Sequence, residues 1–262
     1  MELAETKGLI LFSRDHKEKD KLVKIFTESF GKQMFFVKNA HRKNNPLTPA
    51  LMNFTEAVYF GAIHEEGLSF LNGAKEVRPF RNIQQDIFLT AYGTYMLNLV
   101  DVAIEDRVYD PGLYGFTKQA LMQLDQGSDG EIITNIFELQ LLQRFGVTPQ
   151  LDHCSICGQT QGIFDYSSKY AGLLCQNHFE ADIHRYHADP KAVYFARMFQ
   201  NISFEQINSI QVKSATKTAL RHFIDQLYEE YVGLHLKSKR FIDQMNEWSD
   251  VLQKDQPQNE NL

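Results

Sequence analysis

The chain has 262 residues, of which 43% are hydrophobic and 23% are charged, as in an ordinary globular protein. No apolar run approaches the roughly 20 residues of a transmembrane helix, and the N-terminal stretch MELAETKGLILFSR carries acidic residues where a secretory signal is basic. We therefore expect a cytoplasmic protein without a membrane partner. Its formal net charge of −6 argues at first against a polyanionic ligand.

The N-terminal part of the chain shows the pattern of short β-strands. Five segments have period-two alternation or short apolar runs: GLILFSR (8–14), KLVKIFT (21–27), KQMFFVKNA (32–40), EAVYFGAI (56–63) and GLSFLNG (67–73). Between the second and third segments, the turn Glu28-Ser29-Phe30-Gly31 suits a hairpin with a bulge. Five short strands in about eighty residues predict a small barrel.

After Pro79 the apolar residues repeat at three- and four-residue spacing, which predicts helices. The helical segments are 83–106, 112–124, 131–146, 191–200, 215–236 and 239–248. From Ser249 the chain becomes polar, which predicts a frayed or disordered tail. We expect an α+β protein with a barrel domain (1–80), a helical region (81–150), a metal-binding module (151–180), a second helical region (181–248) and a polar tail (249–262).

All three cysteines lie in one short window that ends in a histidine. Cys154-x-x-Cys157 and Cys175-x-x-His178 are two knuckle-like pairs separated by 17 residues, a spacing that suits four tetrahedral ligands of a structural zinc ion. The residue next to the first pair, His153, is a possible substitute for His178. The alternative is that the cysteines are buried or free thiols. Since doubled pairs of this kind seldom arise by accident, we predict one structural Zn²⁺ per chain.

The sequence offers little support for an enzyme. It contains no phosphate-binding glycine loop, no nucleophile elbow and no HExxH motif. Two groups could be imagined as acid–base or metal residues: the run from His64 to Glu66, and Asp182 with His184 and His187. We interpret both as ordinary polar surface because neither is paired with a nucleophile.

One stretch of the chain is basic despite the negative total. No acidic residue lies between Glu28 and Glu56, whereas this stretch contains the basic residues Lys32, Lys38, Arg42 and Lys43. Together with Phe35 and its neighbour Phe36, they lie on a predicted strand and the loop after it, where a small barrel holds single-stranded nucleic acid by stacking and phosphate contact. The alternative is that the phenylalanines alternate between core and surface and the lysines form a solvated face.

Several motifs resemble the bacterial RecO family of recombination mediators. They are FTESFGK (26–32), FFVKNAHRK (35–43), PALMNF (49–54), IFELQLLQRFGVTPQLDHCSICG (136–158), the CxxC…CxxH window and GLHLKSKRFIDQM (233–245). The resemblance spans about residues 7 to 245, and the order and spacing of the motifs make it specific.

The resemblance implies an N-terminal OB-fold, a helical C-terminal region and an inserted zinc module. It also implies a nucleoid-associated protein that binds single- and double-stranded DNA, anneals complementary strands, contacts single-stranded-DNA-binding protein, and works with RecR in loading RecA. The basic positions that match the family's barrel and its following loop are Lys32, Lys38, Arg42 and Lys43.

Three residues depart from the pattern of the family. Asn39 replaces a common glycine, His178 replaces a common fourth cysteine, and Asn135 replaces an arginine of some relatives. Imidazole is an equally good zinc ligand, so the second departure leaves the metal site intact. The resemblance also implies that single-stranded-DNA-binding protein, which coats the strands, ends in an acidic tail. Basic residues on the C-terminal helices could bind this tail or could equally be a solvated helix face; they are Lys213, Lys217, Arg221 and the run 237–240.

A second hypothesis belongs to another class of protein. The chain could be a zinc-stabilised interaction module that docks proteins through its helices, with a barrel that is purely structural. The two hypotheses differ in whether the barrel binds DNA.

Overall fold

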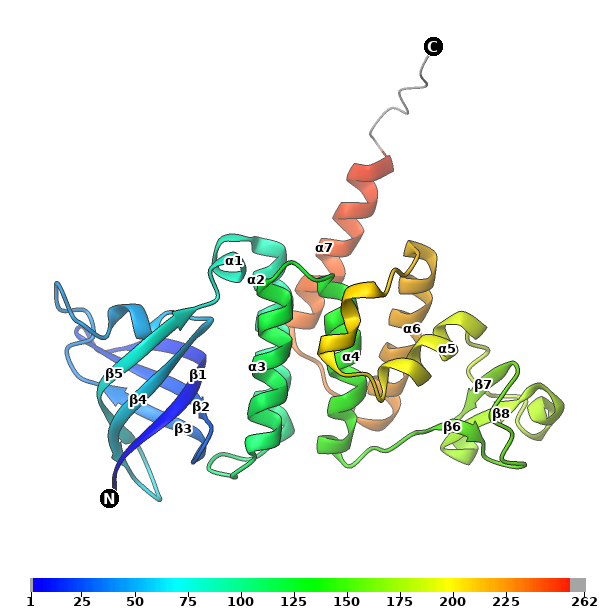
Figure 1. The fold of residues 1–262 in the computed structure, drawn as a ribbon, viewed down its shortest axis with the longest axis horizontal. Helices are drawn as coiled ribbons and strands as arrows, with labels where there is room; N and C mark the ends of the chain where they lie inside the picture. The colour runs from blue at the N-terminus through cyan, green and yellow to red at the C-terminus, as the bar shows by residue number, and fades with distance from the viewer. Residues whose placement is uncertain (1, 255–262) are drawn as a thin grey trace, which may run out of the picture. The chain divides into compact units, whose positions relative to one another are not determined.

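The computed structural model describes residues 2–254, which form two compact units (Figure 1). One contains the residues up to Gln126 together with those from His235 onward, and the other contains Gly127–Leu234. No helix in the described part of the chain is both long and apolar enough to cross a membrane.

Five strands of the first unit close into an antiparallel barrel with one parallel contact, in the order β1-β2-β3-β5-β4. The strands are β1 (Glu2–His16), β2 (Asp20–Thr27), β3 (Gly31–Val37), β4 (Thr55–Ile63) and β5 (Ser69–Pro79). Figure 1 shows the barrel in blue and cyan, with its labelled strands crossing one another. The predicted α+β class with an N-terminal OB-like barrel is confirmed.

The hairpin between β2 and β3 depends on a glycine. Gly31 has φ +63°, and a Cβ there would lie 2.2 Å from the carbonyl oxygen of Val108. The Thr27 hydroxyl closes the turn, since it accepts from the Phe30 amide at 2.9 Å and donates to the Gly31 carbonyl at 2.8 Å. Pairing runs without a register shift from Lys21–Val37 to Thr27–Gly31. The predicted hairpin is therefore confirmed, without the bulge.

The two phenylalanines of β3 point to opposite faces of the barrel. Phe35 is 1% exposed and lies in a core with Val23, Ile25 and Tyr59, whereas Phe36 is only partly buried. Successive side chains of a strand alternate between its faces, so one residue decides which ring is core.

Among the described residues, the first unit has four α-helices: α1 (Arg81–Gln85), α2 (Ile87–Ala103), α3 (Pro111–Asp125) and α7 (Lys237–Lys254). The predicted helix over 83–106 is divided by Asp86, whose carboxylate caps α2 by accepting from the amides of Phe88 and Leu89 at 2.7 and 3.0 Å. The C-terminal helix α7 contacts α2, and the Asn98 amide donates to Ser238 at 3.0 Å.

Two barrel lysines meet two aspartates at the end of α2. Lys24 lies 2.6 Å from Asp101 and 2.9 Å from Asp106, and Lys32 lies 3.0 and 3.4 Å from the same two carboxylates. Burial alone would lower the pKa of Lys24, but its bonds to both carboxylates outweigh burial and raise it. This lysine–aspartate cluster, defined as these four residues, joins β2 and β3 to the helices.

The second unit contains three helices and a small sheet of order β6-β8-β7. Its elements are α4 (Gly130–Leu141), β6 (Gln150–Cys154), β7 (Phe164–Ser167), β8 (Gly172–Cys175), α5 (Pro190–Phe199) and α6 (Ser214–Tyr231). Short 3-10 helices cover Thr48–Leu51 in the first unit and Leu142–Phe145, Ser168–Tyr170, Gln176–Ala181 and Phe204–Ser209 in the second.

A buried ion pair holds α4 against α6. Glu138 is 0% exposed, and its carboxylate accepts from both guanidinium ends of Arg221, at 3.1 Å for Nη2. Asn135, the residue that departs from the family pattern, accepts from Arg221 Nη1 at 3.0 Å. The asparagine therefore takes part in the packing of two helices.

The compact units divide the chain differently from the predicted regions. The predicted helical region 81–150 contributes α1–α3 to the first unit and α4 to the second, and α7 returns to the first unit. Helix α7 also runs six residues past the predicted start of the polar tail at Ser249; the rest of that tail, residues 255–262, lies outside the described residues.

We expect Asp101→Asn to lower the free energy of unfolding by about 3 kcal/mol, because it removes a charge shared by two lysines, of which Lys32 is 2% exposed. Denaturant unfolding followed by circular dichroism measures the change. Glu5→Gln is the matched control, since it breaks the exposed pair with Lys75 on the same barrel and should leave stability nearly unchanged. Equal effects of the two substitutions would contradict the importance of the cluster.

Candidate nucleic-acid interface and metal cluster

Two strand ends and two turns gather the predicted metal ligands. Cys154 ends β6 and Cys175 ends β8, and these strands are neighbours. Cys157 lies in the turn after β6, and His178 lies in the 3-10 helix after β8. The turn requires Gly158, whose φ of +73° lies in the left-handed region.

The distances within this group match a tetrahedral ion. His178 Nδ1 lies 3.6 Å from Cys154 Sγ and 3.3 Å from Cys175 Sγ, the Cys157 and Cys175 sulfurs are 3.8 Å apart, and all four ligand atoms lie within 4.8 Å of one another. Ligand bonds of about 2.3 Å to sulfur and 2.0 Å to nitrogen give tetrahedral edges of about 3.8 and 3.5 Å. The cluster is therefore compatible with a closed, structural metal site.

The protonation of Cys154 also suits a metal ligand. Burial alone would raise the pKa of this thiol, but hydrogen bonds from the backbone at Cys157, Cys175 and Ile156 outweigh burial and lower the pKa to about 6. The thiolate is the form that binds a metal ion. Burial raises the pKa of Cys175, which an ion would have to offset.

The other candidate metal groups do not come together. His153 is engaged with the side chain of Gln150 at 2.8 Å. Asp182 accepts from the Ser167 hydroxyl and from the His184 amide at 3.0 Å. Within residues 2–254, the Cys154–Cys157–Cys175–His178 cluster is the one grouping of three or more such side chains at ligand distances.

Two of the five residues predicted to bind DNA have buried side chains. Phe35 is a core residue, and the Lys32 ammonium is held by Asp101 and Asp106. Burial removes both from contact with a nucleic acid, and the prediction for these two residues is wrong. The charge pattern identified the basic segment but could not reveal the carboxylates of Asp101 and Asp106, the first of which lies 69 residues after Lys32 in the chain.

The other three predicted residues are exposed. Lys38, Arg42 and Lys43 lie in the loop after β3, which is fastened to the β1–β2 turn: the His41 amide donates to the Lys19 carbonyl at 3.2 Å, and the Asn39 amide donates to Asp20 at 2.8 Å. Asn39 has φ +53°, a conformation that asparagine tolerates better than most residues and that explains the common glycine here.

The fastened loops bring together cations that the sequence pattern had left apart. We define the basic rim as Lys17, Lys19, Lys38, Arg42 and Lys43. All five side chains are exposed, and none makes an ion pair with a residue that the structure describes. By contrast, the neighbouring Lys21 and His41 pair with Asp15 at 3.3 and 2.9 Å. The rim therefore provides a positive surface on a chain of negative net charge.

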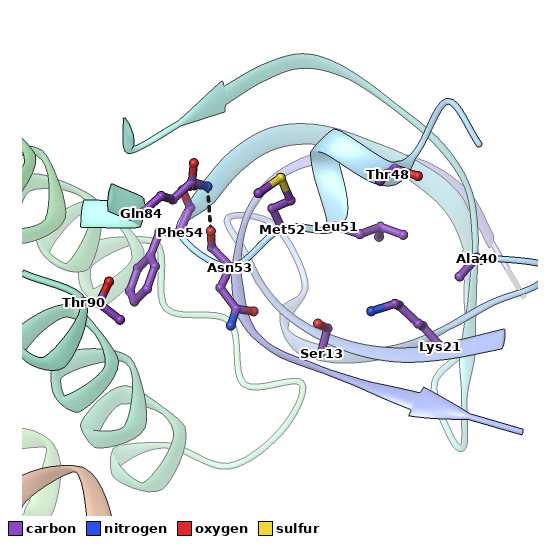
Figure 2. Close-up of a pocket in the computed structure, with 10 residues that line it drawn as sticks. All are labelled: Ser13, Lys21, Ala40, Thr48, Leu51, Met52, Asn53, Phe54, Gln84 and Thr90. Atoms are coloured by element: carbon purple, nitrogen blue, oxygen red, sulfur yellow. Dashed lines mark hydrogen bonds between the residues drawn. The ribbon is translucent and has the colours of Figure 1, made fainter. Parts of the chain in front are cut away.

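A groove of about 430 Å³ includes Ala40, which lies between the rim residues Lys38 and Arg42 in the chain. Figure 2 shows the residues that line this groove. The groove is lined by Ser13, Lys21, Ala40, Thr48, Leu51, Met52, Asn53, Phe54, Gln84 and Thr90. No acidic side chain is among these residues, and the Gln84 amide donates to the Asn53 carbonyl at 2.8 Å, as the dashed line in Figure 2 shows. Apart from Lys21, the lining consists of apolar and neutral polar groups, and the exposed cations of the rim follow in the chain. This combination suits a ligand with phosphates and flat rings.

The fold and these sites define a class of α+β proteins that combine an OB-like barrel with a helical region carrying a Cys₃His cluster. Two family models match the chain: "Recombination protein O N terminal" over residues 1–80 and "Recombination protein O C terminal" over residues 84–240. The chain belongs to the RecO family of DNA repair proteins.

Individual relatives agree with this family. The chain is 66% identical to "DNA repair protein RecO" of Enterococcus faecalis over 96% of both chains. It is 50% identical to the protein of that name from Lactococcus lactis subsp. lactis, over 95% of this chain and 98% of the relative, and 46% identical to that of Streptococcus suis, over 100% and 98%. The family is one of non-enzymatic recombination mediators, in agreement with the prediction that the chain is not an enzyme.

We expect the purified chain to contain one tightly bound zinc ion, because its four ligand atoms already lie at tetrahedral distances. Cys157→Ala should reduce zinc content to well below one ion per chain and unfold the β6–β8 sheet, since structural zinc is coupled to folding by about 10 kcal/mol or more. Elemental analysis and circular dichroism measure both effects. His153→Ala is the matched control and should retain full zinc; a wild-type chain without zinc, when made with ample zinc, would contradict the assignment.

Proposed function

We propose that this chain is a recombination mediator of DNA repair that binds single- and double-stranded DNA, anneals complementary strands coated with single-stranded-DNA-binding protein, and helps RecR to load RecA. The observation that carries the proposal is the basic rim, a group of exposed cations without ion-pair partners among the described residues. Membership of the RecO family supports the same role.

The work of such a mediator comes from binding energy. Cations that neutralise DNA phosphates release condensed counterions, and this gain is independent of base sequence. A surface that binds two strands without sequence preference raises their local concentration and so favours annealing. No nucleotide hydrolysis is needed for these steps.

We propose a purely structural role for zinc. One Zn²⁺ held by Cys154, Cys157, Cys175 and His178 would fix the β6–β8 sheet within the second unit, and four protein ligands would leave no position open for a substrate. The ion would supply cross-linking between two turns and no Lewis-acid chemistry.

Two of the basic residues considered for the acidic tail of single-stranded-DNA-binding protein, Lys217 and Arg221, already form ion pairs within the second unit. Lys217 pairs with Asp129, and Arg221 pairs with Glu138 and with Asp225 at 2.9 Å. We therefore assign the partner contact to neither of them. Lys213 belongs to the second unit and the basic run 237–240 belongs to the first. Neither unit by itself therefore contains all the basic residues considered for the acidic tail.

The competing hypothesis is an interaction module whose barrel is purely structural. The internal positions of Lys32 and Phe35 favour it, but the unpaired rim does not. An isolated 1–80 fragment is a poor test, because it would leave Lys24 and Lys32 without Asp101 and Asp106. The full chain with substitutions on the rim separates the hypotheses instead.

We expect Lys38→Glu combined with Arg42→Glu to weaken binding to single strands of unrelated sequence by about tenfold or more at low salt. Two lost phosphate contacts should also lower the magnitude of the negative slope of log affinity against log salt by about 1.4 for single strands. A fluorescence-anisotropy titration over a salt series measures both quantities.

A matched control is Lys191→Glu combined with Lys213→Glu, which changes the net charge by the same amount. Both positions are exposed and lie at the starts of α5 and α6, where the helix dipole stabilises acidic side chains. The control should bind DNA as the wild type does. Equal affinity and slope in the rim variant, with the fold intact, would favour the structural barrel.

A further inference from the structure

Four aromatic rings run across the outer face of the barrel beside the basic rim. They come from His16 at the end of β1, Phe36 on β3, Phe70 on β5 and His64 after β4. Their centroids are separated by 6.0 Å (His16–Phe36), 5.9 Å (Phe36–Phe70) and 5.6 Å (His64–Phe70). We call these four residues the aromatic row.

The register of the sheet produces the row. Phe36 is directly opposite Phe70 on β5 and Leu22 on β2, and cross-strand partners share one face. Because Phe35 fills the core, Phe36 must point outward. The row is thus a consequence of strand pairing, which sequence patterning of single strands could not reveal.

The rings are available to a ligand. Phe70 is 45% exposed, and Phe36, His16 and His64 are partly exposed. Neighbouring rings meet edge to face, with interplanar angles of 84°, 73° and 63°, so they do not cover one another by parallel stacking. A continuous row of partly exposed rings is typical of a binding surface, whereas scattered apolar residues are not.

We infer that the aromatic row stacks the unpaired bases of single-stranded DNA while the basic rim holds its phosphates. The inference rests on the proposed function. His16 directly precedes Lys17, and Phe36 is two residues before Lys38, so rings and cations are contiguous along both strands. Bases have π-faces that stack on aromatic side chains regardless of sequence, and the phosphates that follow each base require the adjacent cations.

Charge decides between this occupant and two others. A second copy of the chain offers no phosphates to the exposed cations of the rim. An apolar peptide would occupy the rings but leave the cations unused. A duplex hides its base faces within its stack, so it would contact the rim alone. The row therefore adds affinity for single strands only.

The experiment compares two probes of equal length, an oligothymidylate and an abasic deoxyribose-phosphate strand, with the full chain. The wild type should bind the oligothymidylate more tightly. Phe36→Leu combined with Phe70→Leu should lose about tenfold or more of affinity for the oligothymidylate and none for the abasic strand. Phe60→Leu is the matched control, because Phe60 is 40% exposed on the same barrel but its ring covers Gly73, outside the row.

The outcomes separate the inference from the proposed function. The rim variant, Lys38→Glu with Arg42→Glu, should weaken binding of both probes equally. If the row variant keeps the wild-type difference between the probes, while its melting temperature and circular dichroism show an intact fold, the inference is overturned. A changed oligomeric state with an unchanged difference would also overturn it and make the row an interface between copies. If the row variant loses the difference between the probes while the rim variant binds both probes as the wild type does, the aromatic row is supported and the proposed role of the basic rim is wrong.

Discussion

The lysine–aspartate cluster is the constraint that decides which lysines of the barrel are available to a ligand. Lys24 and Lys32 lie on the two strands of one hairpin, and Asp101 and Asp106 hold both of them from the end of α2. A buried ammonium without a carboxylate would be costly, so the barrel and its helices depend on each other. Lys17, Lys19, Lys38, Arg42 and Lys43 stay exposed at the β1–β2 turn and in the loop after β3, where we propose that DNA phosphates bind.

The two units use their charged side chains in different ways. In the first, the same sheet that buries Phe35 presents Phe36 and carries the basic rim. In the second, the Arg221–Glu138 pair holds two helices together, and the Cys₃His cluster brings two turns to the distances of metal ligands. A chain of net charge −6 can thus offer a positive surface, because the local arrangement of charges, and not their total, sets the potential at each site.

Local patterns predicted what local physics controls. The strand segments, the hairpin at Gly31 and the four ligands of the cluster follow from alternation, turn chemistry and spacing, and the structure contains all of them. Long-range partners could not be predicted in this way. The sequence could not show that Lys32 is paired, because the carboxylates that hold it come from another part of the chain. It could not show that Phe35 is buried, because alternation alone does not say which face of a strand is covered. The return of α7 to α2 likewise depends on tertiary packing that no single helix encodes.

The central claim is that the chain promotes strand pairing through its barrel surface and by binding energy alone. The most direct measurement is a fluorescence assay of annealing between complementary strands coated with single-stranded-DNA-binding protein, without nucleotide. Our account predicts that the wild type accelerates annealing, that a Lys191→Glu control does so equally, and that the Lys38→Glu and Arg42→Glu variant does not. Acceleration that requires ATP, or that persists unchanged in the rim variant, would contradict it.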